Sequence, residues 1–567
     1  MKRTKRIFAI FMTLALAMSM LIVSSAVSFA DGETPAATTY TVKVSKDATD
    51  KADHTYAAYQ IFKGKLETKD NAKVLSDIQW GDNVNSATLI SELQKLDDFK
   101  LLPNNASASD VAKAISDKSY GYDSEGAQAL ADAVNKAITG TEKGSANAPA
   151  TEGEDKGKYV INDLAAGYYL IKDKAAVTGE GAQTRFILQV VDNVDVTEKA
   201  NIPSVTKKVK ETNDGDGNVT GWQDAADYDI GDSIPYKLEG TLPGKFEEFD
   251  TYKVYKFIDT LSDGLTPPAP GDVTVKVGNK DVTSHFDVAV NGQVLTVSLK
   301  SGEDLRKWTD PALTATSTIV VEYNATLNEH AKIGSEGNPN TVKLEFTNNP
   351  NGEQDGEKGT TPEDKVIVFT YEIKALKVEP TNDEAIDQAA YEELTDAQKA
   401  DYIKVGDKWQ KTQALSGAGF TLYKKVNGTY EPVGDEVTGA TTFTFKGTDA
   451  GEYKLVETTV PAGYSKAADV EIVVTAGYDT DSADPKLTSL TVSPETAGFV
   501  VESTTTGTGD DAVTTYSGDI TGKILNQKGA VLPSTGGIGT IIFYVLGSLL
   551  VVGCGIVLIS KRRMESR

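Results

Sequence analysis

The sequence has almost none of the residues on which disulfide frameworks and metal centres depend. Cys554 is the single cysteine among 567 residues, so a disulfide within the chain and a cysteine-rich metal site are both excluded. The three histidines, His54, His285 and His330, lie far apart and do not show the spacing of metal ligands. Because no nucleotide or redox motif is present either, no cofactor and no metal are expected.

Basic side chains are also scarce relative to acidic ones. The chain has 57 Lys and Arg against 82 Asp and Glu, a formal net charge of −25, and a surface this acidic repels phosphate backbones. Binding of nucleic acid is therefore not expected. The length predicts three or four domains, and the 50 glycines and 8% aromatic residues are typical of β-sandwiches joined by turns.

The N-terminus has the pattern of a secretory signal. Residues 1–30 begin with four basic side chains, continue as a mostly apolar stretch and end with Ser28-Phe29-Ala30. Ser28 and Ala30 are small residues at the two positions that a signal peptidase recognises, so cleavage is expected after Ala30. A permanent N-terminal membrane helix is the alternative.

The C-terminus carries an uncharged, largely apolar stretch at 537–560, which is long enough to cross a bilayer. A Lys-Arg-Arg cluster follows it and predicts a cytoplasmic tail. Directly before the apolar stretch stands the pentapeptide Leu532, Pro533, Ser534, Thr535 and Gly536. This order resembles the sorting signal of Gram-positive surface proteins. The resemblance implies that a sortase cuts between Thr535 and Gly536 and passes the Thr535 carbonyl to an amine.

The chain between the two ends divides into three segments. Residues 31–200 have strand-like stretches around a helical middle, 201–367 are almost wholly β, and 368–530 are β-rich with one insertion that begins as a short helix. Each of these three segments is expected to be a domain, between the signal segment at 1–30 and the sorting signal with its apolar stretch and basic tail at 531–567. The predicted fold class is mainly β, with tandem immunoglobulin-like β-sandwich domains and helical insertions in the first.

A weak internal repeat connects the first and third segments. AGYYLIKD at 166–173 matches AGEYKLVE at 450–457 at Ala, Gly and Tyr, and both stretches end in an acid. The repeat suggests two related sandwich domains, although convergent strand chemistry explains so short a match about as well.

The third segment carries four stretches that resemble, as a set, the CnaB-type domain of Gram-positive surface proteins. They are YEIKALKVE at 371–379, LSGAGFTLYKK at 415–425, GEYKLVETTVPAGYS at 451–465 and GDITGKILNQKG at 518–529. The resemblance implies a spontaneous isopeptide bond with Lys374 as nucleophile, Asn526 as acceptor and Glu457 as catalyst. Lys377 is the competing nucleophile; it is three residues further on and therefore faces the other side of the strand.

The chemistry of such a bond depends on burial. An exposed lysine is cationic and cannot attack an amide, whereas burial favours the neutral forms of both the amine and a nearby carboxyl. A protonated Glu457 could hydrogen-bond the Asn526 carbonyl and transfer the proton as ammonia leaves. Two ordered strands would hold the reactants together.

The middle segment shows a second lysine of this kind. Val205, Lys207 and Val209 point to one face of a strand, which places a lysine between two inward valines. The segment resembles the CnaA-like shaft domains of pilins, which implies a Lys207–Asn340 bond assisted by Asp259. Asn348 has the same strand parity as Asn340 and is the alternative acceptor, and a lysine that merely lies along a sheet is the simpler interpretation.

Lys199 is a candidate of another type, at the junction between the first two segments. Its surroundings, VDVTEKANIPSVTKK, resemble the pilin motif V-x-x-P-K-N, whose lysine accepts the next subunit. Glu198 stands in place of the motif's Pro, and Ala200 precedes the Asn. Lys207 and Lys208 are the nearest alternative acceptors.

Together these motifs resemble the backbone (major) pilin of sortase-assembled Gram-positive pili. The resemblance implies a structural subunit, not an enzyme, in which Thr535 of one copy is joined to Lys199 of the next. The expected partners are pilus-assembling and housekeeping sortases, identical subunits, minor pilins, peptidoglycan and, for adhesion, host surface ligands. A monomeric wall-anchored adhesin that binds a host protein or glycan is the alternative. A wall-attached enzyme fits worst, because no nucleophile–His–acid arrangement stands out.

Overall fold

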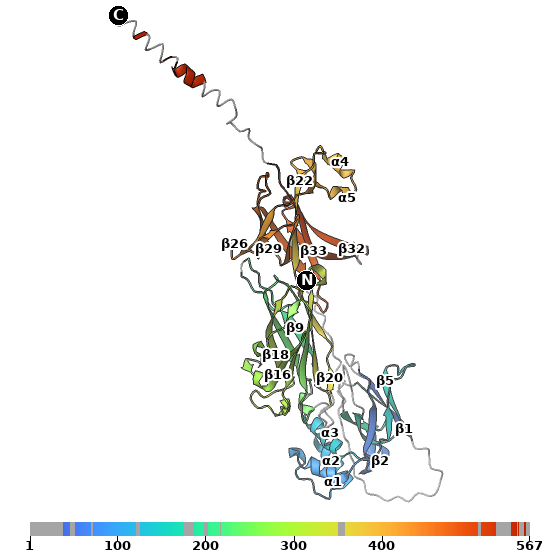
Figure 1. Ribbon diagram of the computed structural model, residues 1–567. Coiled ribbons are helices and arrows are strands. Elements are labelled where there is room, and N and C mark those ends of the chain that lie inside the picture. The colour runs from blue at the N-terminus through green and yellow to red at the C-terminus, as the bar shows by residue number, and fades with distance from the viewer. Residues whose placement is uncertain are drawn as a thin grey trace, which may run out of the picture.

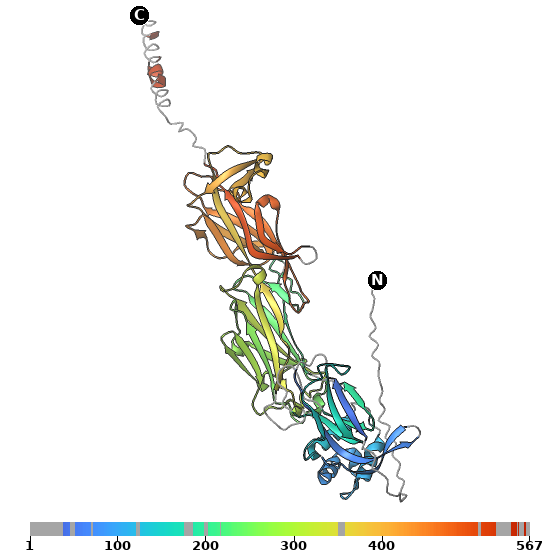
Figure 2. The ribbon, with the colours of Figure 1, turned by 90° about the vertical axis from the view of Figure 1, so that its right-hand side faces the viewer.

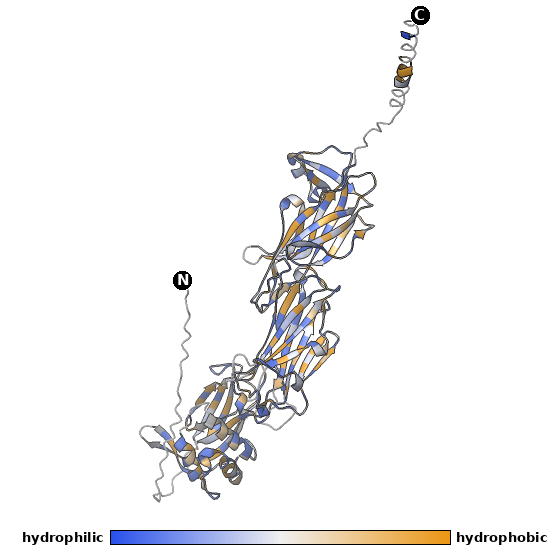
Figure 3. Ribbon diagram, turned by 90° about the vertical axis from the view of Figure 1, so that its left-hand side faces the viewer, coloured by the Kyte–Doolittle hydropathy of each residue, from blue (hydrophilic) through white to orange (hydrophobic). Residues whose placement is uncertain are grey.

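The computed structural model describes residues 38–45, 52–69, 72–118, 120, 125–174, 185–197, 202–215, 217–349, 358–508, 512–528, 546–552, 554 and 561–562. Three β-rich domains follow one another in chain order along an elongated molecule (Figures 1 and 2). Hydrophobic and hydrophilic residues alternate along many strands, as Figure 3 shows, because successive side chains point to opposite faces of a sheet. The predicted mainly β fold is confirmed.

The first domain combines two sheets with a group of helices. One sheet has the order β5-β1-β8, and the other has the order β3-β2-β6-β7 with β4 beside β2. The elements are β1 (Thr39–Ser45), β2 (Tyr56–Lys69), β3 (Ala72–Trp80), α1 (Ser86–Leu93), η1 (Asp97–Phe99), α2 (Ala108–Lys118), α3 (Glu125–Ala137), β4 (Gly144–Ala146), β5 (Lys158–Ala165), β6 (Gly167–Asp173), β7 (Arg185–Val190) and β8 (Val194–Thr197). The helices bury Leu89, Val111 and Val134 in one core with Phe62 and Leu170 of the sheet.

The middle domain is a sandwich of two sheets. The first has the order β10-β21-β19-β12-β17-β16, with β20 beside β19, and the second has the order β15-β14-β18-β11-β9, with β13 beside β18. The strands are β9 (Val205–Val209), β10 (Ala225–Asp227), β11 (Ser233–Thr241), β12 (Tyr255–Leu261), β13 (Leu265–Thr266), β14 (Thr274–Val277), β15 (Lys280–Asp281), β16 (Phe286–Asn291), β17 (Val294–Leu299), β18 (Thr318–Leu327), β19 (Asn338–Thr347), β20 (Lys358–Thr360) and β21 (Asp364–Phe369).

Short 3-10 turns connect several strands of the middle domain: η2 (Phe246–Glu248), η3 (Pro270–Asp272), η4 (Thr283–His285), η5 (Leu305–Lys307) and η6 (Gly334–Glu336). Every second residue of β11, β18 and β19 is buried, so the inward faces of the two sheets form one apolar core. This close-packed core can therefore hold a buried polar site in a fixed geometry.

The C-terminal domain is a second sandwich. Its sheets have the orders β23-β24-β22-β33-β32, with β28 beside β22, and β26-β25-β29-β30-β31, with β27 beside β25. The elements are β22 (Tyr371–Pro380), α4 (Gln388–Glu392), α5 (Asp396–Lys399), β23 (Tyr402–Val405), β24 (Lys408–Ala414), β25 (Gly419–Val426), β26 (Thr429–Pro432), β27 (Val437–Thr438), β28 (Thr442–Thr448), β29 (Gly451–Thr459), β30 (Val470–Tyr478), β31 (Leu487–Ser493), η7 (Glu495–Ala497), β32 (Phe499–Thr506) and β33 (Val513–Leu525).

The first and third domains share a strand pattern. In the first, β1 pairs antiparallel with β5 and parallel with β8; in the third, β22 pairs antiparallel with β28 and parallel with β33. The second sheets correspond as well, since β2-β6-β7 matches β25-β29-β30. The repeated sequence lies on β6 and β29, where Asp173 and Glu457 face Tyr56 and Phe420 of the neighbouring strand. The short sequence repeat therefore lies on equivalent strands of two domains with the same strand pattern.

Several predicted features lie wholly or mostly outside the described residues. They are the signal segment 1–30, Lys199, the pentapeptide 532–536 and most of the apolar stretch 537–560. In the part of the chain that the structure describes, no helix has the length and apolar character needed to cross a membrane.

Candidate functional site

The core of the C-terminal domain contains a buried lysine, carboxylate and amide in contact. Lys377 Nζ lies 3.0 Å from Glu457 Oε1 and also contacts Asn526 Oδ1. Asn526 Nδ2 donates a hydrogen bond to Glu457 Oε1 over 2.9 Å. All three residues are at most 2% exposed. The amine, the amide and the carboxyl group therefore meet without water between them.

The strands of this domain explain why the three residues meet. β22 and β33 run parallel with Lys377 opposite Ile524, and Asn526 N then donates to Val378 O, which holds the asparagine beside the lysine. Glu457 on β29 comes from the facing sheet, and its Oε2 accepts a hydrogen bond from Ala467 N over 2.6 Å. The backbone fixes the carboxylate before any chemistry takes place.

The assignment of Lys374 as the nucleophile is wrong. Its side chain is 28% exposed and pairs with Glu372 at 2.8 Å and Asp519 at 2.9 Å, on the outer face of β22. The inner face of this strand carries Ile373, Ala375 and Lys377 at every second position. Lys377, the competing nucleophile, therefore occupies the place that was expected for Lys374.

The environment of Lys377 favours its neutral amine. Burial lowers the pKa of Lys377, and the hydrogen bond and charge of Glu457 offset this only in part. The centroid of the Phe420 ring lies 5.3 Å from Lys377 Nζ, where the ring attracts the charged form and adds to this partial opposition.

The middle domain holds a second buried cluster of the same composition. Lys207 Nζ lies 2.7 Å from Asp259 Oδ1. The Tyr323 hydroxyl contacts Asp259 Oδ2 and lies 3.0 Å from Lys207 Nζ. The same hydroxyl oxygen accepts a hydrogen bond from Asn340 Nδ2 over 2.9 Å. Lys207, Asp259 and Asn340 are completely buried. The structure thus brings together the three residues that the sequence singled out.

Four strands contribute to this cluster. Lys207 lies on β9 and Tyr323 on β18 of one sheet, whereas Asp259 on β12 and Asn340 on β19 face them from the other. Asn348, the alternative acceptor, lies beyond the end of β19. Sequence reasoning missed Tyr323, although the alternation of β18 places it on the same inward face as Val321 and Ala325.

Burial shifts the pKa values of both the lysine and the acid in the middle cluster. Burial lowers the pKa of Lys207 to about 8, and the charge of Asp259 only partly opposes this change. Burial likewise raises the pKa of Asp259, so a neutral amine beside a protonated carboxyl is within reach. Among the described residues, none donates a hydrogen bond to Asn340 Oδ1. This oxygen can therefore accept a proton or a hydrogen bond from an acid.

The first domain differs at the corresponding position. Asp173, which occupies the place of Glu457, accepts hydrogen bonds from Thr55 N at 2.9 Å and contacts His54 Nδ1 at 2.6 Å. Both side chains of the Asp173–His54 pair are fully buried. Among the described residues, the carboxylate at this position is thus paired with an imidazole and not with a lysine ammonium.

The alternatives to Lys199 as an exposed acceptor can be judged from the structure. Lys207 is completely buried and cannot reach another protein. Lys208 is on the opposite face of β9, is 28% exposed and pairs with Asp224 at 2.5 Å. Of these two alternatives, only Lys208 has a side chain that solvent can reach.

Three family models match the sequence. Residues 230–350 match the Cna-B-like domain of Gram-positive pilin backbone subunit 2, residues 401–486 match a prealbumin-like fold domain named SpaA, and residues 524–566 match the LPXTG cell wall anchor motif.

Individual proteins are similar over most of the chain. The trypsin-resistant surface T6 protein of Streptococcus pyogenes serotype M6 is 28% identical in an alignment of 416 positions that covers 64% of this chain and 70% of that protein. The solved T6 backbone pilin of the same serotype matches with 18% identity and a TM-score of 0.47, over 88% of this chain and all of that one. The major pilin SpaA of Corynebacterium diphtheriae matches with 14% identity and a TM-score of 0.40, over 86% of this chain and all of that one.

Proposed function

We propose that this chain is a backbone pilin of a Gram-positive pilus with an LPXTG cell wall anchor, and that a sortase joins its copies head to tail. The observation that carries this proposal is the pair of buried lysine–acid–asparagine clusters in the two domains before the anchor motif. Such clusters suit a subunit that must resist tension along its length.

The internal bonds form without an enzyme. The neutral Lys377 amine attacks the side-chain carbonyl carbon of Asn526, the bond to the amide nitrogen breaks, and ammonia leaves while Glu457 transfers the proton. In the middle domain Lys207, Asn340 and Asp259 take the same roles, and Tyr323 holds the acid and the amide in line. One ammonia is released for each bond, so no other reactant is needed.

These two bonds would divert tension away from most of the chain. A force that enters at β9 would pass from Lys207 to Asn340 directly, and residues 208–339 would carry none of it. After β21 and the start of β22 the force would pass from Lys377 to Asn526, so residues 378–525 would be bypassed as well. Only the short backbone segments outside the two bonded loops would extend under load.

Polymerisation uses the sorting signal. A sortase cysteine displaces Gly536 from the Thr535 carbonyl and forms a thioester, and the Lys199 amine of a second copy displaces the cysteine to give an amide. A housekeeping sortase then transfers the last subunit to an amine of peptidoglycan. Minor pilins and host surface ligands are the remaining proposed partners. Because the T6 relative is named for trypsin resistance, we propose the same property here.

The experiment that tests the proposal is a denaturing gel of wall extracts. The wild-type chain should give a ladder of covalent multimers, and Lys199→Ala should give monomers only, with the internal bonds intact. Lys208→Ala is the matched control, because Lys208 is a partly exposed lysine shortly after Lys199 in the sequence, and this variant should keep the ladder.

Two results would change the assignment in different ways. A ladder that persists in Lys199→Ala and disappears in Lys208→Ala would move the acceptor to Lys208. A wild-type strain without any ladder would contradict the pilus and favour a monomeric wall-anchored adhesin.

A further inference from the structure

The middle and C-terminal domains are packed into each other at their joint. β21 leads into β22 through Thr370 alone, and Ala225, Ile367 and Phe369 of the middle sheet belong to the apolar core of the C-terminal domain. Beside this core, the backbones of Gly334 and Gly518 touch so closely that a Cβ on Gly334 would lie 2.4 Å from the Tyr516 carbonyl oxygen. The joint therefore has the packing of a domain interior.

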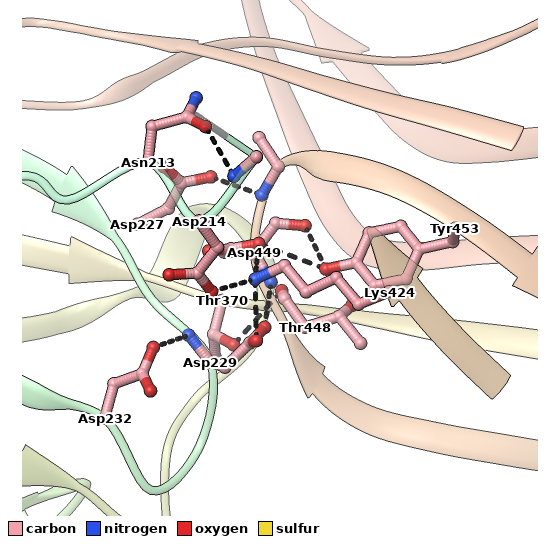
Figure 4. Close-up of polar contacts among 12 residues, drawn as sticks. Asn213, Asp214, Asp227, Asp229, Asp232, Thr370, Lys424, Thr448, Asp449 and Tyr453 are labelled. Atoms are coloured by element: carbon pink, nitrogen blue, oxygen red, sulfur yellow. Dashed lines mark hydrogen bonds and ion pairs between the residues drawn. The ribbon is translucent and has the colours of Figure 1, made fainter. Parts of the chain in front are cut away.

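Polar contacts across the joint are centred on one ammonium group (Figure 4). Lys424 Nζ of β25 lies 2.6 Å from Asp214, 2.7 Å from Asp229 and 2.7 Å from Asp449. Asp214 and Asp229 come from the middle domain, whereas Lys424 and Asp449 come from the C-terminal domain. The side chain of Lys424 is only 4% exposed. The protein thus supplies its own cation to these carboxylates.

A second carboxyl pair at the joint shares a single hydroxyl group. Tyr478 OH on β30 lies 3.2 Å from Asp227 Oδ1 and 3.3 Å from Glu211 Oε2. Asp227 Oδ2 also accepts a hydrogen bond from Ala450 N across the joint over 2.9 Å. Asp227 is 4% exposed, and its own N–H donates to Glu211 Oε2 over 2.8 Å. One hydroxyl donates to only one carboxylate at a time, so Tyr478 OH hydrogen-bonds both groups only when one of the two carboxyls carries a proton.

The surroundings offer this pair little positive charge. The charged and titratable groups that act on Glu211 are Asp214 from the loop after β9, Asp227, Tyr228, and Tyr478 on β30. Those that act on Asp227 are Tyr371 on β22, Lys424 on β25, Asp449, Tyr453 and Tyr478. Asp229 and Asp232 complete the network around Lys424. The ammonium of Lys424 is already in contact with three other carboxylates. Six carboxyl groups therefore share one ammonium.

We propose that this joint is a proton-dependent clamp, in which Glu211 and Asp227 share a proton that holds the two domains together, and whose loss at alkaline pH lets them move relative to each other. The clamp would hold together the two domains that are joined by the backbone between Asn340 and Lys377, a stretch that the two internal bonds would leave under load. It concerns domain movement and does not depend on polymerisation.

The direction of the pH effect follows from the buried carboxyls. Burial, and then the charge of Asp227, raise the pKa of Glu211 to about 9, and burial raises the pKa of Asp227 as well. The closed joint therefore binds a proton that the open joint releases. Closure is favoured at acidic pH and weakens as the pH rises from the ordinary carboxyl range through about 9. For one retained proton the ratio of open to closed joints rises up to about tenfold per pH unit in this window.

Spin labels on the two domains test the clamp. The full chain is solubilised in detergent with Cys554→Ser, and labels are attached at Asn291→Cys of the middle domain and Asp435→Cys of the C-terminal domain, both exposed. The distance distribution between the labels should be narrow at pH 5 and broader at pH 9.5. In Asp227→Asn the side-chain amide cannot ionise, and its oxygen still accepts the hydrogen bond from Ala450 N. The distance distribution of this variant should therefore stay narrow at both pH values.

Matched variants separate the clamp from general effects of pH. Asp484→Asn removes the 2.5 Å ion pair between Asp484 and Lys365, which lies across the same joint. The label-to-label distance distribution of this variant should broaden at pH 9.5, as that of the wild type does. Glu211→Gln should behave like Asp227→Asn, which covers the case in which one variant fails to fold. An unchanged wild-type distribution between pH 5 and 9.5, or equal broadening in all variants, would overturn the proposal.

Discussion

Replacing Lys377 with alanine gives the sharpest test of the C-terminal bond. The wild-type chain should be lighter than its sequence by about 34 Da, because each of two bonds releases ammonia of about 17 Da. Lys377→Ala should restore about half of this difference. Lys374→Ala, three residues away on the exposed face of the same strand, should leave the full difference.

The stability of the same variants can be estimated from the structure. Lys377 and Asn526 are 149 residues apart, and a cross-link that closes a loop of this length restricts the unfolded chain by about 5 kcal/mol, by analogy with a disulfide. Glu457→Gln keeps the shape of the side chain but cannot transfer the proton, so its loss of unfolding free energy contains the missing bond and the Lys377 amine that is left without its carboxylate. Lys377→Ala should lose more, because it also removes the buried atoms of the lysine side chain.

The measurements are intact mass and denaturant unfolding of the C-terminal domain in the full chain. A Lys374→Ala chain that regains about 17 Da, while Lys377→Ala does not, would refute the assignment of Lys377. A Glu457→Gln chain with the full mass difference would show that the carboxyl is not required.

Four further outcomes are expected. Asp259→Ala should remove only the middle-domain bond. Tyr323→Phe should form this bond more slowly, so that a pulse–chase mass measurement shows an unbonded fraction. Full bonding of Tyr323→Phe at the wild-type rate would contradict the role of Tyr323. Leu344→Ala, which empties a fully buried core position, should cost about 2–5 kcal/mol of unfolding free energy in denaturant titrations. Trypsin should cut the first domain before the other two, and equal digestion of all three on a time course would contradict the placement of the bonds.

Local alternation was enough to find part of each site. In β9 the pattern Val205, Lys207, Val209 predicted the inward lysine, because a period of two fixes which side chains share a face. The same rule applied to β22 identifies Lys377, since Ile373 and Ala375 precede it on the inner face. The assignment of Lys374 used the family resemblance without this alternation.

Contacts between domains could not be predicted in this way. Glu211 and Tyr478 are 267 residues apart in the sequence, and only the packing of the middle domain on the C-terminal domain brings them together. Tyr323 was missed for a related reason, because a tyrosine in an alternating strand is ordinarily a core residue. The repeat on β6 and β29 was short in sequence, yet the matching strand order shows that it reflects a shared fold.

Mass spectrometry of material released from the cell wall tests the central proposal most directly. After proteolysis, the account predicts a branched peptide in which the carbonyl of Thr535 is joined to the side-chain nitrogen of Lys199. Its fragment spectrum should locate the branch on that lysine. Finding Thr535 attached only to peptidoglycan, with Lys199 recovered unmodified, would contradict the account.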